Sequence, residues 1–365
     1  MRGSHPWRTL PASVFKPAGS TLAASTTEFR IVSRVDSLLA DIELLIRADH
    51  ACRGLLCADT MHWHQGNLAR AARGLALRSG TVAIITGFAV PFPAGPIAET
   101  DGPPGAALLG EVLHHLGRKV VLVTDDVCAE ALRVAATTSG LPADCVEEMP
   151  VNSASPDVWV TDFLTRHPLD DLIAIERVGP SHTPASFLSQ PRSTELTADE
   201  FARRVPPEHQ NHCHNMRGEI IDRLTAPLHR IFDLAAALPR SPATVGIGDG
   251  GNEIGMGSLP WEEISARLQG PQADWIPCRI ATDNTILAGV SNWGGQALAA
   301  AVALLAGRPE VARAWTPQRQ TAVLQELVER GLAVDGATRR AQPTVDGLSI
   351  EVYLEPWAAI DRLIV

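Results

Sequence analysis

A glycine-rich segment in the second half of the chain combines a permissive backbone with acidic side chains. TVGIGDGGNEIGMG, residues 244–257, holds six glycines, two carboxylates and an asparagine directly after an apolar run. Glycine permits positive φ and close approach of the main chain to a ligand, and N–H groups at the start of a helix can hold a carboxylate or a phosphate. We therefore expect a small-molecule site here; tight packing of a helix on a sheet is the alternative use of the glycines.

Two nucleotide-binding motifs fit this segment poorly. The Gly-Lys-Ser/Thr ending of a phosphate-binding P-loop is missing. Residues 246–251 match Gly-x-Gly-x-x-Gly literally, but the acids within and beside that match would repel a pyrophosphate. The sequence therefore predicts neither an ATP nor an NAD cofactor.

Acidic side chains also follow the other predicted strands. In an open parallel sheet, ligands bind at the carboxyl ends of the strands, so the residues directly after each apolar run are informative. Several carboxylates at one edge resist ionisation together unless a cation neutralises them, and Mg²⁺ and Mn²⁺ favour all-oxygen ligands. Each acid by itself could equally cap the following helix. The strand-end acids are Glu99, Asp101, Asp125, Asp126, Glu176, Asp249, Glu253 and Asp283, with Arg177 beside Glu176.

Two groups of these acids are the strongest candidates. Asp249, Glu253 and Asp283 are the predicted ligands of a divalent metal, Mg or Mn. Glu99 and Asp101 lie in GPIAETDGPPGA, where the two prolines can start a helix and stiffen the preceding loop. Such stiffness suits the orientation of a reacting group; a rigid turn without a function is the alternative.

Alternating apolar runs and amphipathic segments predict the fold that must position these residues. The expected class is α/β, with a mostly parallel, Rossmann-like layered sheet and helices on both faces. Residues 1–33 are predicted as a flexible leader and 34–365 as a single α/β catalytic domain; residues 181–210 are expected to form a loop or insertion. Predicted strands cover residues 81–88, 119–126, 171–179, 243–248 and 278–283, and predicted helices include 35–49, 67–80, 104–116, 127–139, 215–238 and 292–307.

Composition restricts the class of partner. The formal net charge is -10, without a basic block, which argues against nucleic acid and anionic membranes. Six cysteines occur without a Cys-x-x-Cys pair, which predicts reduced thiols and a cytoplasmic location, or the mitochondrial matrix if the leader is a presequence. The histidines at 209, 212 and 214 are interpreted as part of an ordinary surface loop.

Taken together, several motifs resemble the D-glutamate cyclase family, which comprises the C-terminal catalytic domain of the mitochondrial enzyme and its stand-alone microbial relatives. The resemblance spans most of residues 35–355. It rests on TGF (86–88), ETDGPPGA (99–106), ERVG (176–179), GDGGNEIGMG (248–257), NWGGQALA (292–299) and VDGLSIEVYLE (345–355).

This resemblance implies a lactam-forming hydro-lyase. The α-amine of D-glutamate would attack the side-chain carboxyl, water would leave, and 5-oxo-D-proline would form, with metal assistance and without ATP. On this reading Glu99, Asp101, Asp249 and Glu253 are catalytic. The predicted substrate-binding residues are Thr86, Gly87, Arg177, Gly250, Gly251, Asn252 and Asn292.

Three other functions remain open at this point. A Mn- or Mg-dependent hydrolase or phosphatase of small molecules could use the same acids, a nicotinamide-binding protein could use the glycines, and a non-catalytic sensor could use the whole pocket. The expected partner is a small molecule, D-glutamate or a related amino acid. The sequence leaves a homo-oligomer open.

Overall fold

The structure, a computed structural model, describes the chain from Leu22 to Val365. Residues 1–21 of the predicted leader lie outside the described residues, and helix α1 (Leu22–Leu45) covers the remainder of that leader. Residues Leu38–Val365 form one compact unit, which contains the sheet and the site described below.

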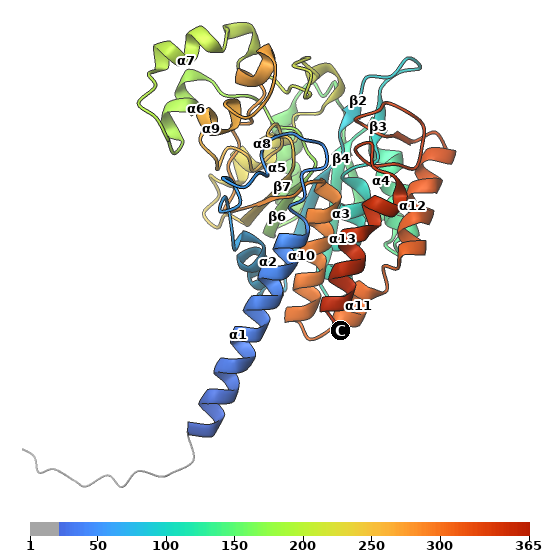
Figure 1. The fold of residues 1–365 in the computed structure, drawn as a ribbon. Coiled ribbons are helices and arrows are strands. Elements are labelled where there is room, and N and C mark those ends of the chain that lie inside the picture. The colour runs from blue at the N-terminus through green and yellow to red at the C-terminus, as the bar shows by residue number, and fades with distance from the viewer. Residues whose placement is uncertain (1–21) are drawn as a thin grey trace, which may run out of the picture. The chain divides into compact units, whose positions relative to one another are not determined.

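Six parallel strands form the central sheet of this unit (Figure 1). Their order in space is β5-β4-β1-β6-β7-β8, the 3-2-1-4-5-6 order of a doubly wound fold, which reverses direction between β1 and β6. The predicted α/β fold with a mostly parallel, Rossmann-like sheet is confirmed. The strands are β1 (Thr81–Thr86), β4 (Lys119–Asp125), β5 (Val146–Met149), β6 (Leu169–Ile175), β7 (Ala243–Gly248) and β8 (Asn284–Leu287).

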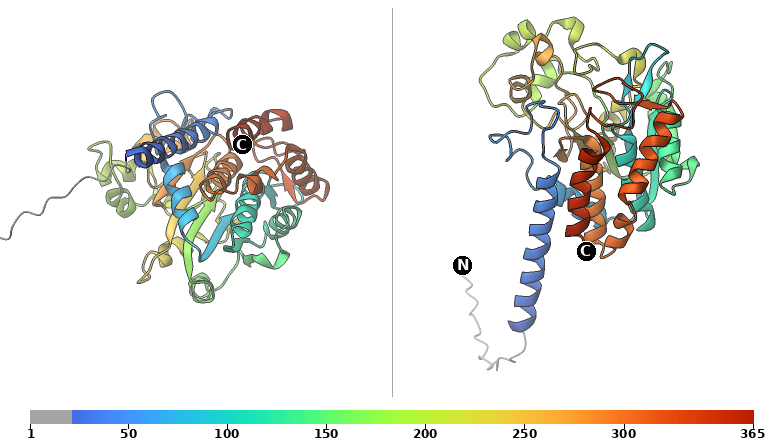
Figure 2. Two further views of the ribbon diagram at one scale, coloured as in Figure 1. Left: turned by 90° about the horizontal axis from the view of Figure 1, so that it is seen from below. Right: turned by 45° about the vertical axis from the view of Figure 1, so that its right-hand side comes forward.

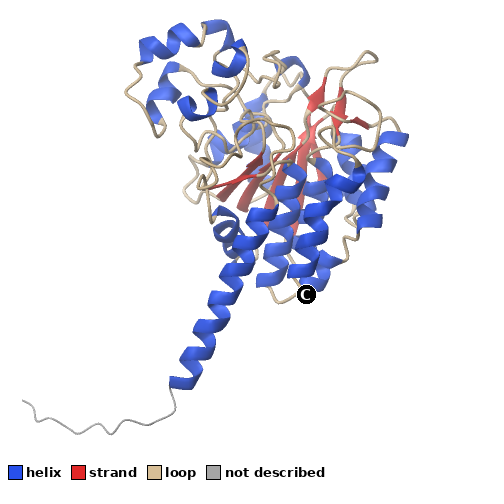
Figure 3. Ribbon diagram, in the orientation of Figure 1, coloured by secondary structure: helices blue, strands red, loops and turns tan. Residues whose placement is uncertain are grey.

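Helices cover both faces of the sheet, so the strands need apolar side chains on both sides. In β1, Val82 and Ile84 alternate with Ala83 and Ile85, and all four are fully buried. Ala83 and Ile85 belong to a core cluster with side chains of α5 and α8, whereas α3 and α10 pack together on the other face. The strands run between these helical layers (Figures 2 and 3).

The principal helices pack around this sheet. Their bounds are α2 (Asn67–Leu77), α3 (Pro103–His115), α4 (Ala129–Thr138), α5 (Pro156–Arg166), α8 (His229–Ala235), α10 (Ser291–Leu305), α11 (Pro309–Arg313), α12 (Pro317–Glu329) and α13 (Ile350–Leu363).

A second, smaller sheet lies beyond the end of β1. It has three short strands in the order β2-β3-β9, namely β2 (Ala89–Val90), β3 (Ile97–Glu99) and β9 (Ala333–Val334). Because β3 ends at Glu99, pairing of β3 with β9 fixes the backbone that leads into the Glu99–Asp101 loop. This sheet therefore supports one of the predicted acidic segments.

The segment predicted as a loop or insertion contains two short helices. Helix α6 (Pro184–Ser189) and helix α7 (Ala198–Arg204) each begin with a capping box. Phe187 and Phe201 stack on each other and pack against Trp261, at the start of α9 (Trp261–Ser265). This aromatic cluster gives the insertion a small core of its own.

Two predicted elements are wrong. Residues 215–238, predicted as one helix, form turns followed by the short α8, with a 3₁₀ turn at Asp222–Leu224. Residues 278–283, predicted as a strand, form only isolated bridges, with Cys278 opposite Ser181 and Ala281 opposite Gly255. The sixth strand of the sheet, β8, begins one residue later, at Asn284.

Two further observations concern the chain as a whole. None of the helices in the described part of the chain combines the length and apolarity that a bilayer crossing requires. All six cysteines are free thiols, as the absence of paired spacing predicted.

Candidate active site

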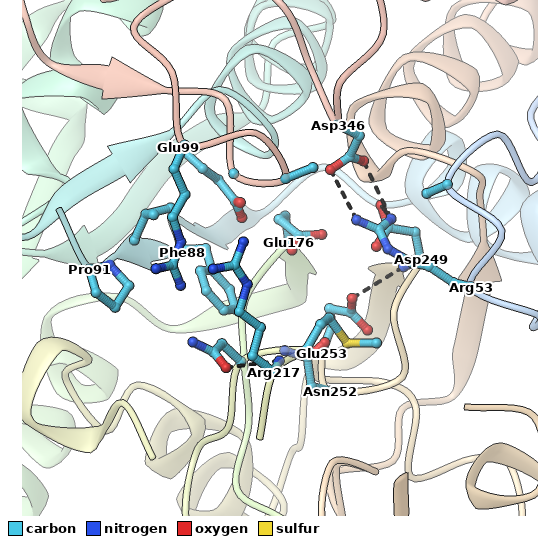
Figure 4. Close-up of a pocket in the computed structure, with 17 residues that line it drawn as sticks. Arg53, Phe88, Pro91, Glu99, Glu176, Arg217, Asp249, Asn252, Glu253 and Asp346 are labelled. Carbon is cyan, nitrogen blue, oxygen red and sulfur yellow. Dashed lines mark hydrogen bonds and ion pairs between the residues drawn. The ribbon is translucent and has the colours of Figure 1, made fainter. Parts of the chain in front are cut away.

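A pocket of about 290 Å³ opens at the carboxyl edge of the central sheet (Figure 4). Ligand pockets for drug-sized molecules usually occupy roughly 300–1,000 Å³, so this one suits a small ligand. Its walls come from segments far apart in the sequence, including the loops after β1, β3, β6 and β7 and the loop before α13. Its polar lining residues are Arg53, Glu99, Glu176, Asn215, Arg217, Asp249, Asn252, Glu253, Arg339 and Asp346.

Six neighbouring carboxyl groups form what we call the acidic cluster: five of them line the pocket, and Asp101 lies next to Asp249 and Asp346. Two overlapping sets of three, which share Asp249, each have one oxygen per residue lying within 4.8 Å of the others. Glu99 completes the cluster, because a hydrogen bond joins it to Glu176. The first set is Asp101, Asp249 and Asp346, and the second is Glu176, Asp249 and Glu253.

Asp101 is held by an exchange of helix caps. Its carboxylate accepts hydrogen bonds from the backbone N–H groups of Ser291 (2.9 Å) and Asn292 (2.7 Å), at the start of α10. In return, Asn292 Oδ1 accepts from the N–H groups of Gly102 (3.0 Å) and Gly105 (2.8 Å), at the start of α3. The two helix N-termini are thereby fixed to each other, and the side chain of Asn292, predicted to contact substrate, makes hydrogen bonds within this pair of caps.

Arg53 supplies a positive charge inside the pocket. Its Nη1 lies 2.7 Å from Asp249 Oδ2, and its Nη2 lies 3.0 Å from Asp346 Oδ1. One guanidinium thus bridges two members of the acidic cluster, which lie about 100 residues apart in the sequence (Figure 4). Coulombic attraction to both carboxylates raises the pKa of Arg53 against the opposing effect of burial.

The glycine-rich segment folds around one of its own acids. Glu253 Oε1 accepts the N–H of Gly250 (2.7 Å), and Glu253 Oε2 accepts the N–H of Gly251 (2.8 Å). These are the N–H groups predicted to hold a substrate anion; in the structure they donate to the chain's own carboxylate. The side chain of Asn252 lines the pocket and donates to the carbonyl of His214 (2.9 Å).

Glu99 and Glu176 favour their protonated forms. Burial raises the pKa of each well above the usual value for glutamate, and nearby carboxylates raise both further. Glu176 accepts a hydrogen bond from Ser291 Oγ (2.6 Å), and its backbone has a positive φ of 45°. A non-glycine residue in that conformation costs of order 1–3 kcal/mol and is typical of sites where the side-chain position matters.

The same forces act on the two buried aspartates. Burial raises the pKa of Asp101 to about 7, with a further contribution from Asp346, while the hydrogen bonds from α10 oppose the rise. Burial raises the pKa of Asp249 well above its usual range, although Arg53 opposes that shift. Burial thus raises the pKa of four carboxyl groups of the cluster, which is a feature typical of functional sites.

A divalent metal fits the donor set of the acidic cluster. All the candidate ligand atoms are carboxylate oxygens, which hard cations prefer, and Glu99 Oε1 is buried without a hydrogen-bond partner. The hydrogen bonds that Glu176 and Glu253 already accept leave lone pairs free, because an ionised carboxylate has about four acceptor sites. Asp249 and Glu253, both predicted ligands, lie in one of the two sets.

Asp283, the third predicted ligand, lies at the opposite edge of the sheet. It precedes β8, and its Oδ2 accepts from the N–H (2.8 Å) and the Oγ1 (3.0 Å) of Thr244, at the start of β7. The wrong strand prediction for residues 278–283 explains this difference. Asp283 was expected at the carboxyl end of a strand, but it directly precedes β8, at the amino end. Asp283 therefore shares no site with Asp249 and Glu253.

Arg177, another residue predicted to bind substrate, lies beneath the pocket. Its guanidinium is buried and donates to Asp125 Oδ2 (2.7 Å) and to the carbonyls of Gly87 (2.8 Å) and Ala226 (2.7 Å). It does not line the pocket, so its role is to join β4, β6 and the loop after β1 beneath the pocket. Thr86 and Gly87 lie in the same layer; Phe88 is the residue of that segment that lines the pocket.

Sequence reasoning missed four charged residues of the pocket. Arg53, Arg217 and Arg339 come from irregular segments, where no periodic pattern marks them. Asp346 lies in the Asp-Gly turn of VDGLSIEVYLE, so a signal was present but was used only for the family resemblance. The position of Glu176 after a strand marks it as a strand-end acid, but the sequence predicts no specific role for it.

Comparisons with known proteins show the family of the chain. A family model described as "D-glutamate cyclase-like, C-terminal" matches residues 42–185 and 201–361. The unmatched residues 186–200 fall in the insertion that carries α6 and α7. "D-glutamate cyclase, mitochondrial" from Homo sapiens is 28% identical over 337 residues, which cover 86% of this chain and 48% of the human protein. The chain thus spans about half the length of this relative.

Proposed function

Because the chain belongs to the D-glutamate cyclase-like family, we propose that it converts D-glutamate to 5-oxo-D-proline with loss of water, in the pocket at the carboxyl edge of the sheet. The observation that carries this proposal is the acidic cluster, in which burial raises the pKa of Glu99, Glu176 and Asp249. A dehydrating cyclisation needs both a proton donor and a proton acceptor within one small pocket. No observation on the described residues specifically favours the hydrolase alternative.

The chemistry sets three requirements. The nitrogen of the α-amine forms a bond to the γ-carbon, and the bond from that carbon to one carboxyl oxygen breaks. The ammonium group gives up two protons in total, and the leaving oxygen takes up two, so that one water is released for each lactam. The substrate must also be folded on itself, because an oriented intramolecular attack avoids much of the entropic cost of a bimolecular reaction.

Residues of the cluster can meet the proton requirements. Asp249 is the proposed acceptor from the ammonium group, because burial raises the pKa of its carboxyl, which makes the carboxylate a stronger base, while the ion pair with Arg53 at 2.7 Å partly offsets that rise. Glu99 and Glu176 are the proposed donors to the leaving oxygen, because their raised pKa keeps a proton available. Asp101 and Asn292 fix the loops that carry these groups through the exchange of caps.

A divalent metal is part of the proposal. Held by Asp249 with Asp101 and Asp346, it would polarise the γ-carboxyl and stabilise negative charge on its oxygen; held by Asp249 with Glu176 and Glu253 it would do the same and leave Glu99 as the proton donor.

The proposed location follows from the thiols and from the human relative. Six free cysteines suit a reducing compartment, so we propose the cytoplasm, or the mitochondrial matrix in keeping with the printed name of the human relative.

The test is chiral mass spectrometry of the purified chain incubated with D- or L-glutamate in Mg²⁺, Mn²⁺ or EDTA. We expect 5-oxo-D-proline from the D-isomer, and loss of product in EDTA that added Mn²⁺ or Mg²⁺ restores. Product that is insensitive to EDTA would retain the cyclase and remove the metal. Absence of lactam from either isomer in every condition would overturn the proposed function.

A further inference from the structure

We propose that Arg217 and Arg339 bind the α-carboxylate of the substrate at the mouth of the pocket, and so restrict turnover to amino acids with a free α-carboxylate. This inference rests on the proposed function and assigns a specificity site to it. Both arginines line the pocket together with the acidic cluster. Neither lies in a helix or strand.

The groups deeper in the pocket leave an α-carboxylate no cationic partner. Arg53 is already bridged between Asp249 and Asp346, and Arg177 is occupied beneath the pocket. The N–H groups of Gly250 and Gly251 are occupied by Glu253. Among the described residues that line the pocket, Arg217 and Arg339 are the remaining arginines.

A compact turn positions Arg217. Asn215 Oδ1 accepts the N–H groups of Arg217 (3.0 Å) and Glu219 (3.1 Å), and Asn215 Nδ2 donates to Glu219 Oε2 (2.6 Å). The turn is anchored to the glycine-rich segment by the bond from Asn252 to the carbonyl of His214. The Arg217 side chain extends from this turn toward the acidic cluster (Figure 4). Arg217 is an exposed residue that also lines the pocket, so it can meet an entering anion.

A second turn positions Arg339 on another side of the pocket. Arg339 has a positive φ of 54°, and its N–H donates to the carbonyl of Asp335 (2.8 Å). The buried carboxylate of Asp335 accepts from the N–H groups of Thr338 (2.8 Å) and Gly347 (2.7 Å). Asp335 therefore ties the turn of Arg339 to the turn of Asp346. The side-chain contact of Arg339 is a long one, 3.4 Å to the exposed Glu219, which a substrate carboxylate could replace.

The proposed reaction requires the reacting groups of the substrate and its α-carboxylate to bind in different parts of the pocket. The ammonium group and the γ-carboxyl must meet among the proton donors and acceptors of the cluster. The α-carboxylate takes no part in bond making and keeps its charge in the product. Placing it at the mouth separates it from the buried carboxylates, whose repulsion would otherwise oppose binding. Guanidinium groups suit the task because they bind carboxylates with paired hydrogen bonds.

The experiment compares D-glutamate with its α-amide, which keeps the amine and the γ-carboxyl but lacks the α-carboxylate charge. Lactam formation from both is measured for the unaltered chain and for Arg217→Gln, Arg339→Gln and the double variant. Arg340→Gln is the matched control, because Arg340 is exposed and adjacent to Arg339 but does not line the pocket. Circular dichroism and thermal unfolding establish that each variant is folded.

We expect each single substitution to lower kcat/KM for D-glutamate by about tenfold, and the pair by about a hundredfold, mainly through KM. The value for the α-amide should change less than about twofold, so that the preference for D-glutamate disappears in the double variant. A preference that survives in the double variant, or an equal loss for both substrates, overturns the inference while lactam formation by the unaltered chain keeps the proposed function. Absence of lactam in the unaltered chain overturns both.

Discussion

The two edges of the central sheet both bury carboxylates, but they neutralise them differently. At the amino edge, Asp171 is fully buried between two guanidinium groups, those of Arg78 and Arg118, with 2.7 Å between its Oδ2 and Arg118 Nη2. At the carboxyl edge, the six carboxyl groups of the acidic cluster share one inner guanidinium, that of Arg53. The carboxylates are buried at both edges. Only at the carboxyl edge do the carboxyl groups of the acidic cluster outnumber the guanidinium groups that contact them.

This difference indicates which buried acid is structural and which is a candidate for chemistry. A buried ion pair with its partners in place holds elements together, and its charge is unavailable to a ligand. An undercompensated cluster binds protons or cations, because like charges disfavour joint ionisation. The next three predictions test that distinction, beginning with the largest expected effect.

The largest effect is expected on turnover. Asp249→Asn should lower kcat for lactam formation by at least about a hundredfold, because it removes a proton acceptor and a shared metal ligand. The matched control is Asp283→Asn, the same change at the amino edge, which should leave kcat within about twofold. A near-normal rate in Asp249→Asn would remove Asp249 from the reaction, and a large loss in Asp283→Asn would contradict the assignment of the two edges.

The second effect is on the free energy of unfolding. Here the substitution at the amino edge should have the larger effect and the substitution at the carboxyl edge the smaller one. Asp171→Asn should lower the free energy of unfolding by about 3 kcal/mol, because it leaves the buried Arg118 guanidinium without its counter-ion. Asp249→Asn should cost much less, since it relieves repulsion within the acidic cluster. Urea-induced unfolding of both variants, in EDTA, measures the difference. Equal losses would show that both edges depend on their acids in the same way.

The third effect is a change in the pH dependence of stability. The raised pKa of Asp101, about 7 in the folded chain against about 3.9 in an unfolded one, means that the folded state holds more protons between those values. The contribution of Asp101 to the free energy of unfolding should therefore fall as pH rises from about 4 to about 7, and then stay constant.

Asp101→Asn should remove this slope. The loss of caps on α10 adds an offset that does not depend on pH, so the comparison uses the difference between the two curves rather than their heights. Unfolding in urea at intervals from pH 4 to pH 8, in EDTA, gives both curves. A difference that does not vary with pH would contradict the raised pKa.

The sequence predicts the central strands well where the apolar run is continuous. The prediction for residues 243–248 coincides with β7, and the prediction for 119–126 extends one residue beyond β4. Both strands are buried on two faces, which requires the unbroken apolar pattern that the prediction uses. Residues 278–283 carry a similar pattern, but Cys278 and Ile280 are buried against loops, so the same signal arises without a ladder of strand pairs.

The candidate site is only partly predictable for a related reason. Asp249 and Glu253 follow a strand directly, so the general rule for parallel sheets points to them. Arg53, Asp346, Arg217 and Arg339 reach the pocket through turns, and their places depend on contacts between distant parts of the chain. The contact between Arg53 and Asp346 joins residues separated by 293 positions, a distance at which no local pattern carries information.

The contact between Glu253 and the N–H groups of its own loop has one more consequence. A glycine-rich loop without such a partner would be flexible, and ordering it around a ligand would consume part of the binding free energy. Here the Glu253 carboxylate accepts the loop N–H groups that a ligand would otherwise bind. The loop is therefore ordered when the chain folds rather than when the substrate binds. The substrate therefore meets a preformed surface, and the entropy of the loop belongs to the cost of folding instead of the cost of binding.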